Sequence, residues 1–323
     1  MLPSKLHHII KLFSGSFPLD FYWRWTGKLQ VLPFYHTVSD HPLPHFSELK
    51  YYRSKKRFLD DLDFFTSHFE NVSMAEVGKE KKSFHLSFDD GMAEMYSVVF
   101  PILQEKNLDA TFFINTDFVD NKCMFISHKI SLLQHELKKS SQNRQRISGY
   151  LECETGAIHS YLNKINSEKA DEIAKLIHLD FTEYLKQHQP YLTTKQIITL
   201  KNAGFTIGNH GKSHRNFNTL TFEEQKNEIE TVNSFLKQWG VDDLFFCFPY
   251  GDYKIKNELF HWMYQEGGIE KSFGISGLKE DGFPRHHHRI LMEHENFSAE
   301  EIIRSEYLYF MLKSVLNKNK IRR

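Results

Sequence analysis

The sequence has few cysteines and no excess of charge of either sign. Its three cysteines among 323 residues, Cys123, Cys153 and Cys247, are odd in number and scattered along the chain. This pattern is unlike a disulfide framework and favours a reducing compartment. Lysine and arginine together number 41, as do aspartate and glutamate, so the overall charge gives no reason to expect nucleic acid as a partner.

Long hydrophobic runs are also missing. No stretch approaches the roughly 18 consecutive apolar residues of a membrane-spanning helix. Residues 1–30 lack both the uninterrupted apolar core and the small-residue cleavage site of a signal peptide. We therefore expect a protein that is cytoplasmic, or peripheral at the inner face of a membrane.

Residues 1–28 form an N-terminal segment with two interpretations. An apolar helical face precedes an aromatic cluster; the residues are Leu6, Ile9, Ile10 and Phe13, then Phe17, Phe21, Tyr22, Trp23 and Trp25. Amphipathic helices usually pack against the protein's own body. Aromatic residues on such a helix are also typical of a segment that lies on a membrane surface. Peripheral membrane contact through residues 1–26 is therefore the second hypothesis.

The rest of the chain alternates strand and helix patterns. With 40% hydrophobic residues, it can bury a large core. Alternation of this kind predicts an α/β fold with a parallel sheet that closes into a distorted (β/α) barrel, formed by residues 29–120 and 191–316. Residues 121–190 read as helices and are expected to be an insertion over the barrel mouth. Residues 317–323 form a basic tail, which we expect to be solvated.

Residues 83–91 contain the first strand end that suggests chemistry. Phe84, Leu86 and Phe88 alternate with polar residues, as in a half-buried strand, and the pattern stops at Asp89 and Asp90. Carboxylates at the C-terminal end of a strand, just before a helix, lie where α/β proteins carry their functional residues. Aspartate and glycine also form ordinary turns, so this segment alone leaves both interpretations open.

A second strand end carries two histidines. A short strand at residues 205–207 is followed by His210 and His214, and a helical turn between them would point both imidazoles the same way. Two histidines and one carboxylate form a ligand set for zinc that leaves positions for water and substrate. The chain has 19 histidines, so such pairs also arise by chance. Their position after a strand favours a site.

A third strand end follows the apolar run of residues 244–248. Continuous apolar runs are typical of buried parallel strands, and Pro249 and Gly251 then break the strand. We expect this turn to present the backbone N–H of Tyr250, which follows Pro249, to the same cavity. Pro249 and Tyr250 are therefore candidate residues on the substrate side of the site.

These segments together resemble the polysaccharide deacetylase family, the carbohydrate esterases with NodB homology. Ser-Phe-Asp-Asp-Gly at residues 87–91 is similar to the first motif of the family, and residues 110–114 are similar to the strand that follows it. His210 and His214 match its His-x-x-x-His motif, and residues 248–251 match the end of its third motif. The resemblance implies a distorted barrel of the NodB type.

The resemblance also implies roles for individual residues. Asp89 would be the general base, and Asp90, His210 and His214 would hold a divalent metal. Zn²⁺ is the expected ion, with Co²⁺, Ni²⁺ or Mn²⁺ as alternatives. The N–H of Tyr250 would donate to the oxyanion of the reaction.

Three departures from the family pattern concern the surroundings of these residues. Gly211 stands where the family usually has serine or threonine, so one support of the histidine loop is missing. Cys247 stands where many members carry an arginine that orients the catalytic aspartate. We expect Arg289, at the edge of the last strand, to reach Asp89 and replace that arginine.

The third departure is that no clear Leu-x-His motif, the usual source of the general acid, occurs near the C-terminus. His36, at the end of a strand expected over residues 29–36, is the first candidate for this role. His294, near the usual position in the family, is the second.

Three consecutive histidines at residues 286–288 resemble a metal-binding tract, but adjacent residues cannot all face one ion. We expect them to form a solvated basic bend.

The expected function is metal-dependent hydrolysis that removes N-acetyl groups from an N-acetylated sugar and releases acetate. The sugar would belong to a polysaccharide, an oligosaccharide or a glycolipid, and the missing secretion signal favours an intermediate of glycan assembly. Two alternatives stay open. One is a sugar-binding protein on the same fold that has lost turnover, and the other is a metal amidohydrolase of a small molecule.

Overall fold

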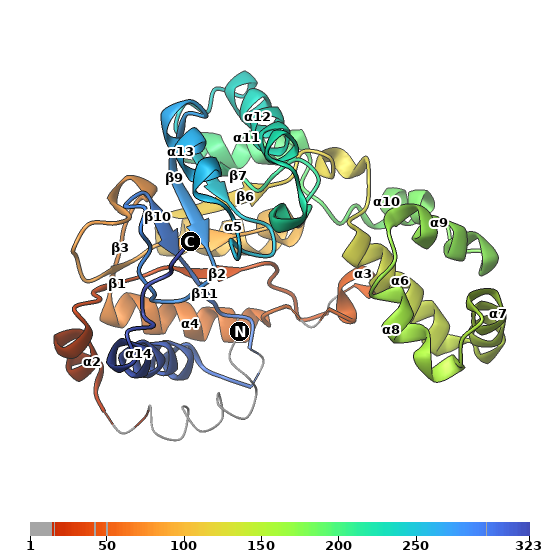
Figure 1. Cartoon of the computed structure of the whole chain (residues 1–323), viewed down its shortest axis with the longest axis horizontal. Coiled ribbons are helices and arrows are strands. Elements are labelled where there is room, and N and C mark those ends of the chain that lie inside the picture. The colour runs from red at the N-terminus through yellow and green to blue at the C-terminus, as the bar shows by residue number, and fades with distance from the viewer. Residues whose placement is uncertain (1–14, 16, 42, 50, 295) are drawn as a thin grey trace.

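The computed structural model describes residues 15, 17–41, 43–49, 51–294 and 296–323 (Figure 1). The apolar face expected at Leu6, Ile9, Ile10 and Phe13 therefore lies outside the described residues. Among the helices described, none combines the length and the apolar character needed to cross a membrane.

An eight-stranded sheet forms the centre of the molecule (Figure 1). Its order is β10-β9-β8-β7-β6-β5-β2-β11, and all its pairings are parallel. The strands are β2 Pro33–Tyr35, β5 Leu86–Phe88, β6 Ala110–Ile114, β7 Thr206–Asn209, β8 Leu244–Cys247, β9 Ile269–Gly274, β10 His286–His288 and β11 Ile290–Leu291. Because the strands are parallel, their C-terminal ends meet at one end of the sheet.

The two edge strands of this sheet are consecutive in the chain, with Arg289 between them. The N–H of Arg289 donates to the carbonyl of Gly274 in β9 at 3.0 Å, and the N–H of Ile290 donates to the carbonyl of Leu32 at 2.8 Å. One short segment thus pairs with both edges and nearly closes the sheet into a barrel. This confirms the expected α/β barrel and places Arg289 at its seam.

A smaller parallel sheet of three strands extends the barrel at the N-terminal ends of β2 and β5. Its order is β1-β4-β3, with β1 Gln30–Val31, β4 Ser83–Phe84 and β3 Glu70–Asn71. The strand expected over residues 29–36 is therefore divided between two sheets. The strand before Asp89 is divided in the same way.

Helices cover the outside of the barrel (Figure 1). In the order of the chain they are α2 Leu19–Thr26, α4 Lys55–His68, α5 Phe100–Lys106, α11 Thr194–Asn202, α12 Phe222–Gln238, α13 Asn257–Gln265 and α14 Ala299–Val315. The short helix α3 Pro44–Ser47 lies away from the barrel, beside the insertion described below (Figure 1). A π-helical turn, Met95–Val99, precedes α5. Capping boxes begin α11 at Thr193, α12 at Thr221 and α14 at Ser298, and these satisfy N–H groups at the helix starts.

Both faces of β5 are buried, although the sequence predicts a half-buried strand. Phe88 stacks between Tyr35 and Phe112, with ring centroids 5.6 and 5.3 Å apart. Ser87 is also buried, 2% exposed, and its hydroxyl accepts a hydrogen bond from Arg289. The apolar side chains of β5 therefore lie on its outer face, which helices cover. Its polar side chain lies inside the barrel, which closes over the other face.

The insertion consists of α6 Ile126–Lys139, α7 Ser141–Leu151, α8 Ile158–Leu162, α9 Ser167–Leu176 and α10 Phe181–His188. These helices project to one side of the barrel (Figure 1). The start of the insertion borders the site described below, because the ring of Phe125 lies edge-on to that of His214 at 5.0 Å. A role for the insertion as a lid stays a prediction.

The described part of the N-terminal segment has one face on the protein and one in solvent. Trp23 Nε1 donates to the hydroxyl of Tyr307 in α14 at 3.1 Å, and the ring of Tyr22 stacks on the ring of Tyr307. Phe17 and Trp25 remain 41% and 71% exposed. Packing against the protein's own body therefore accounts for only part of the aromatic cluster.

The basic tail is held against the protein at its end. Arg323 forms ion pairs with Asp252 and Asp281, and the N–H of Ile321 donates to the carbonyl of Glu280 at 2.8 Å. The prediction of a solvated tail is wrong for these residues, because acidic side chains from two loops attract the guanidinium.

The prediction of a solvated bend at the three histidines is also wrong. Residues 286–288 form β10, and His286 and His288 are only 4% and 7% exposed. Side chains alternate along a strand, so these two share one face while His287 points to the other. The rule that adjacent residues cannot share an ion holds, but it does not apply to positions two apart.

Candidate metal centre and active site

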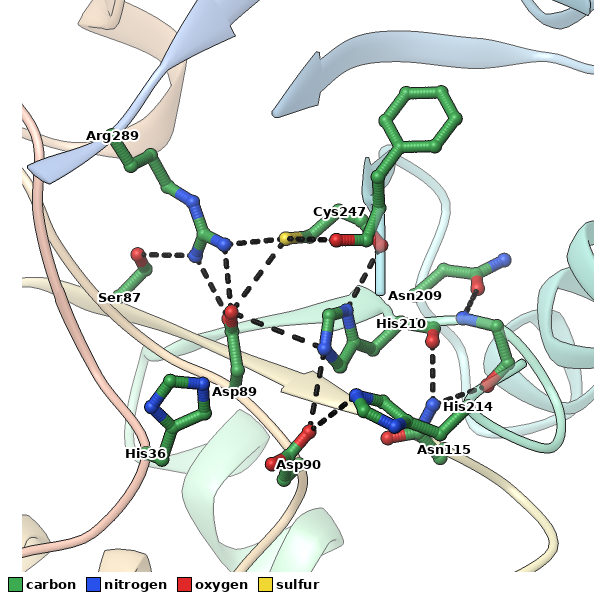
Figure 2. Close-up of polar contacts among 12 residues, drawn as sticks. His36, Ser87, Asp89, Asp90, Asn115, Asn209, His210, His214, Cys247 and Arg289 are labelled. Atoms are coloured by element: carbon green, nitrogen blue, oxygen red, sulfur yellow. Dashed lines mark hydrogen bonds and ion pairs between the residues drawn. The ribbon is translucent and has the colours of Figure 1, made fainter. Parts of the chain in front are cut away.

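Residues from three parallel strand ends meet in one buried cluster (Figure 2). Asp89 and Asp90 follow β5, His210 follows β7 and Cys247 ends β8. His214 comes from the loop beyond His210. Among the described residues, Asp90, His210 and His214 each offer an atom within 4.8 Å of the others. The structure thus brings together the three residues that the sequence predicts as metal ligands.

The geometry of these three side chains fits a metal ion. One carboxylate oxygen of Asp90, Oδ1, lies 3.4 Å from Nε2 of His210 and 3.1 Å from Nε2 of His214. That oxygen is buried and has no hydrogen-bond partner within the described residues. A buried oxygen that faces two imidazole nitrogens matches the oxygen–nitrogen ligand set of Zn²⁺ and related ions. These residues therefore fit the divalent metal that the sequence implies.

Backbone contacts orient His210 for this role. Its Nδ1 lies 2.9 Å from the carbonyl oxygen of Cys247, so Nδ1–H donates and Nε2 is the nitrogen turned toward Asp90. A hydrogen bond on the far nitrogen is the usual support of a histidine ligand. Burial opposes ionisation of Asp90, but the neighbouring His214 and His210 outweigh it and hold the pKa of Asp90 well below its usual range.

The sequence pattern predicts a helical turn in the histidine loop. The structure has a bent loop instead, and this loop brings the two imidazoles together. Asn115 donates from Nδ2 to the carbonyls of His210 and Gly211. The carboxylate of Glu228 accepts from the N–H and the hydroxyl of Ser213. These contacts support the loop, so the glycine at 211 does not leave it unsupported.

Three residues of the site have left-handed backbone conformations, which are uncommon for residues other than glycine. The φ angles are 72° at Asp90, 54° at His214 and 58° at Tyr250. Such conformations persist only where the surrounding structure fixes them, and they gather at functional sites. Three of them lie here in the loops after β5, β7 and β8, which agrees with the functional role that the sequence predicts for this cluster.

Arg289 forms a two-point ion pair with Asp89. Its two terminal nitrogens lie 2.8 and 2.7 Å from the two carboxylate oxygens, and one of them also donates to the hydroxyl of Ser87 (Figure 2). Burial raises the pKa of Asp89, but Arg289 and His210 outweigh it and leave the pKa lowered. Asp89 is therefore ionised and fixed beside the candidate metal ligands.

A sequence model of polysaccharide deacetylases matches residues 76–258, which is more than half of the chain and includes all four of these acidic and histidine positions. The chain belongs to the polysaccharide deacetylase family. This confirms the resemblance drawn from the motifs. A search of curated proteins gave no match.

Solved structures of deacetylases share the fold. The deacetylase PplD of Streptococcus pyogenes, in complex with acetate, is 15% identical, with a TM-score of 0.55 over 85% of this chain and 97% of that one. IcaB from Ammonifex degensii is 15% identical, with a TM-score of 0.53 over 86% and 96%. A de-N-acetylase from Aggregatibacter actinomycetemcomitans is 15% identical, with a TM-score of 0.52 over 84% and 97%. These similarities confirm the barrel as the deacetylase fold.

The departure of this family member at Cys247 is explained by the space around Asp89. The thiol of Cys247 lies 3.7 Å from Oδ2 of Asp89, to which it donates, and its sulfur accepts a hydrogen bond from Arg289. The guanidinium of Arg289 also lies over the ring of Phe34 at 4.3 Å. Because Arg289 enters from the seam and fills the position beside Asp89, the small side chain of Cys247 leaves the room that it needs. The expected proximity of Arg289 and Asp89 is present, and the orienting role stays a prediction.

Asp89 lies between Arg289 and His36 in Figure 2, and Glu293 holds His36. Nδ1 of His36 is 2.6 Å from Glu293 Oε2, and Oε1 accepts from the backbone N–H groups of His36 and Thr37. Burial lowers the pKa of His36, but the Glu293 carboxylate outweighs it and raises the pKa to about 9. His36 is therefore protonated at neutral pH.

The second candidate for the general acid, His294, is placed differently. Its backbone carbonyl accepts from Arg53, and its ring lies edge-on to Phe297 at 6.1 Å. Its neighbour in the chain, Glu293, is the residue that the structure brings to His36.

The turn after β8 places Tyr250 against the candidate metal ligand His214. Its ring lies 4.7 Å from the ring of His214 and is 54% exposed. Within the described part of the chain, no hydrogen bond occupies the Tyr250 N–H. Pro249 precedes it and packs near Gly211. Donation of this N–H to a group in the site stays a prediction.

Sequence reasoning missed several supporting residues. Asn115 directly follows β6, so the rule that found Asp89, a polar residue at the end of a parallel strand, also applies to it. Glu228 lies within α12 and Glu293 lies beyond the short strand β11. No local pattern distinguishes those two acids from surface glutamates.

Proposed function

We propose that this protein is a metal-dependent deacetylase that removes N-acetyl groups from an N-acetylated sugar of a glycan or glycolipid and releases acetate. The observation that carries the proposal is the convergence of Asp90, His210 and His214, with Asp89 fixed beside them by Arg289. A ligand set of three side chains leaves positions open for substrate and water, as catalytic metal sites require.

Asp90, His210 and His214 would hold the ion. A divalent metal at this position polarises an amide carbonyl and makes water a stronger nucleophile at neutral pH. The proton transfers and the binding of the oxyanion depend on side chains and backbone groups around the ion.

Asp89 would accept the proton of the attacking water. Arg289 lowers its pKa and keeps it ionised, and the two-point contact holds it in one orientation. A positioned base of this kind typically contributes about 10²–10⁴-fold to the rate.

The N–H of Tyr250 would donate to the oxyanion that forms from the acetyl carbonyl. Its backbone is fixed at a φ of 58° by the turn after β8, so the donor is in position before the reaction starts. One such donor typically stabilises the transition state by about 3–4 kcal/mol.

His36 would give a proton to the leaving amine. It is protonated because Glu293 raises its pKa to about 9, and its charge is close enough to lower the pKa of both Asp89 and Asp90. The Glu293–His36 pair thus supplies what the missing Leu-x-His motif provides in other members of the family.

An N-acetylated sugar is supported by exposed aromatic rings around the site. Tyr51 is 41% exposed, and its ring lies 6.0 Å from that of His36; Tyr250 is 54% exposed beside His214. Rings that border a polar site can stack on the apolar face of a sugar. The neighbouring structures are described as deacetylases, one of them in complex with acetate.

The decisive experiment measures acetate release from N-acetylglucosamine oligomers by protein reconstituted with Zn²⁺ or Co²⁺. Asp89→Asn serves as the matched control, because it keeps the size of the side chain and removes the base. Release by the wild type, with loss in Asp89→Asn, supports the proposal. Absence of release from oligomers and from N-acetylated glycolipids, in protein shown to hold metal, would contradict it.

A further inference from the structure

A second cluster of metal-type side chains lies behind the turn that carries Tyr250. Among the described residues, Asp252, Asp281, His286 and His288 each offer a ligand atom, and these atoms lie within 4.8 Å of one another. Nε2 of His286 is 3.3 Å from Oδ2 of Asp252, and Nε2 of His288 is 3.4 Å from Oδ2 of Asp281. All four side chains are at most 5% exposed.

One histidine of this cluster is oriented as metal-bound histidines are. Nδ1 of His286 lies 2.7 Å from the hydroxyl of Ser272, which is itself paired with the hydroxyl of Tyr264 at 2.6 Å. This contact fixes the ring, so Nε2 points to Asp252. Support of the far nitrogen by a second shell of polar groups is the usual arrangement at metal centres.

The other histidine lacks the hydrogen bonds that a buried imidazole needs. Within the described residues, neither ring nitrogen of His288 has a hydrogen-bond partner, although the residue is only 7% exposed. Buried polar atoms are normally satisfied by protein, water or an ion. One of these nitrogens, Nε2, lies 3.4 Å from the carboxylate of Asp281 without forming a hydrogen bond. This unsatisfied buried nitrogen is an observation independent of the cluster's composition.

The backbone beneath the cluster leaves space for it. A Cβ atom at Gly274 would collide with the carboxylate of Asp252 and would lie 2.7 Å from Nδ1 of His288. Gly274 is a strand residue, in β9, with no positive φ to require glycine. The close approach of the two ligand candidates gives the reason for a residue without a side chain.

A positive charge already occupies this position. The guanidinium of Arg323 bonds to the carboxylates of Asp252 and Asp281 and donates to the backbone carbonyl of Asp252. Arg323 belongs to the irregular segment after α14, whereas the four other residues are anchored in the barrel and its loops. One guanidinium neutralises one of the two carboxylates; a divalent ion neutralises both and also satisfies the imidazoles.

We propose that Asp252, Asp281, His286 and His288 form a second site for a divalent transition metal ion such as Zn²⁺, in which the ion replaces the guanidinium of Arg323. Two nitrogen and two oxygen ligands make a closed four-coordinate set, and four protein ligands distinguish a structural zinc site from a catalytic one, which keeps an open position. The site at Asp90 has three ligands and open positions. The two sites therefore differ in role: the second fixes the turn between Tyr250 and Asp252 and takes no part in the chemistry.

The test is metal content per chain, measured by elemental analysis after equilibration with Zn²⁺ and removal of free ion. The double variant Asp90→Asn/His214→Ala removes two of the three candidate ligands of the first site, but Asp89, His210 and Cys247 remain within 4.8 Å of one another there. A remaining ion is therefore assigned to the second site only through its loss in variants of the second cluster. We expect one equivalent to remain in this background. The equivalent is lost when His288→Ala or Asp281→Asn is added.

Two further variants make the result specific. His287→Ala changes the adjacent residue on the opposite face of β10, so the second equivalent is retained. Arg323→Gln removes the competing cation, so the second equivalent binds more tightly than with Arg323 present. With Co²⁺, the visible spectrum of the second site is that of a four-coordinate ion.

The proposal is overturned if the Asp90→Asn/His214→Ala background holds no ion both with Arg323 and with Arg323→Gln, while circular dichroism shows a folded chain. In that case Arg323 is the permanent cation of the cluster. The measurement does not use deacetylase activity, so its outcome is independent of the proposed function.

Discussion

The guanidinium of Arg289 and the carboxylate of Asp89 form a buried two-point ion pair, with nitrogen–oxygen distances of 2.8 and 2.7 Å across 200 residues of sequence. The barrel seam brings them together, because Arg289 lies between the two strands that close it. The same guanidinium holds Ser87 and contacts Cys247. One residue thus links barrel closure to the orientation of the proposed base.

Replacing Arg289 by lysine tests this link. Lysine keeps a positive charge but cannot make two parallel contacts with a carboxylate, so Asp89 loses its fixed orientation. We expect kcat for acetate release to fall by about 100-fold, the size of effect seen when a reacting group is misplaced. Metal content is unchanged, because Asp90, His210 and His214 are untouched. Equal loss of metal and activity would instead assign Arg289 a purely structural role.

The two neighbouring aspartates are expected to fail in different ways. Asp89→Asn removes the base and keeps the metal, so kcat falls by about 10³-fold. Asp90→Asn removes a charged ligand, so metal affinity falls first and activity returns partly when Zn²⁺ is raised. Activity and bound metal measured on the same preparations separate the two. If Asp89→Asn loses its metal, or Asp90→Asn retains it with unchanged affinity, the assignment of the two roles is wrong.

The pair of His36 and Glu293 predicts the alkaline limit of activity. The pKa of His36 is raised to about 9, so the proton donor is present below that pH and is lost as pH rises through it. Glu293→Gln removes the carboxylate that raises the pKa, whereas burial, which lowers it, remains. The alkaline limb of the kcat profile should therefore move to lower pH by more than one unit. An unshifted limb would exclude His36 as the donor.

The same pair contributes to stability with a defined sign. Because the folded-state pKa of His36 lies above its unfolded value of about 6.5, the contribution is complete below that value and is lost as pH rises through about 9. The midpoint of thermal unfolding should fall more between these pH values in the wild type than in Glu293→Gln. Parallel curves for the two proteins would show that the ion pair does not titrate in this range.

Gly211 offers a test of the loop that carries the histidines. Its φ of 77° is in the left-handed region, where a side chain typically costs about 1–2 kcal/mol. Gly211→Ala should therefore lower the free energy of unfolding by about that amount. Gly211→Asn is the matched control, since asparagine tolerates this conformation better. If both variants unfold like the wild type, the glycine is not required by the backbone.

Three of the site residues that the sequence predicted, Asp89, Asp90 and His210, share one property: each is a polar residue within two positions of the end of a strand with a clear pattern. Asp89, Asp90 and His210 follow strands of three to four residues in a parallel sheet, and parallel strand ends necessarily meet. Their convergence could therefore be inferred without knowing the order of the strands. The contact of Arg289 at the seam was predicted in another way. Cys247 stands where many family members carry an arginine, so a different arginine was expected to take its place.

What could not be predicted depends on contacts between segments with no shared local pattern. Glu293 reaches His36 only because β11 pairs with β2 in the same sheet. The sequence of β10 predicted a bend, because the strand is only three residues long and all three are polar. Its buried histidines lie against the charged residues Asp252 and Asp281, which Arg323 also contacts. Charged residues are expected in solvent unless their partners are known, and here the partners lie far apart in the chain.

The exposed aromatic residues of the N-terminal segment predict contact with a membrane surface. Phe17 and Phe21 stack at 4.4 Å, and Phe21 lies 6.0 Å from Trp25, so these three rings form one patch. Phe17 and Trp25 are 41% and 71% exposed, whereas Trp23 is turned inward onto Tyr307. Rings in this arrangement can enter the interface of a bilayer. We expect the wild type to float with anionic liposomes, and the double change Phe17→Ser/Trp25→Ser to reduce the floating fraction without changing the thermal midpoint. Equal flotation of the two proteins, or none by either, would assign the patch to another surface.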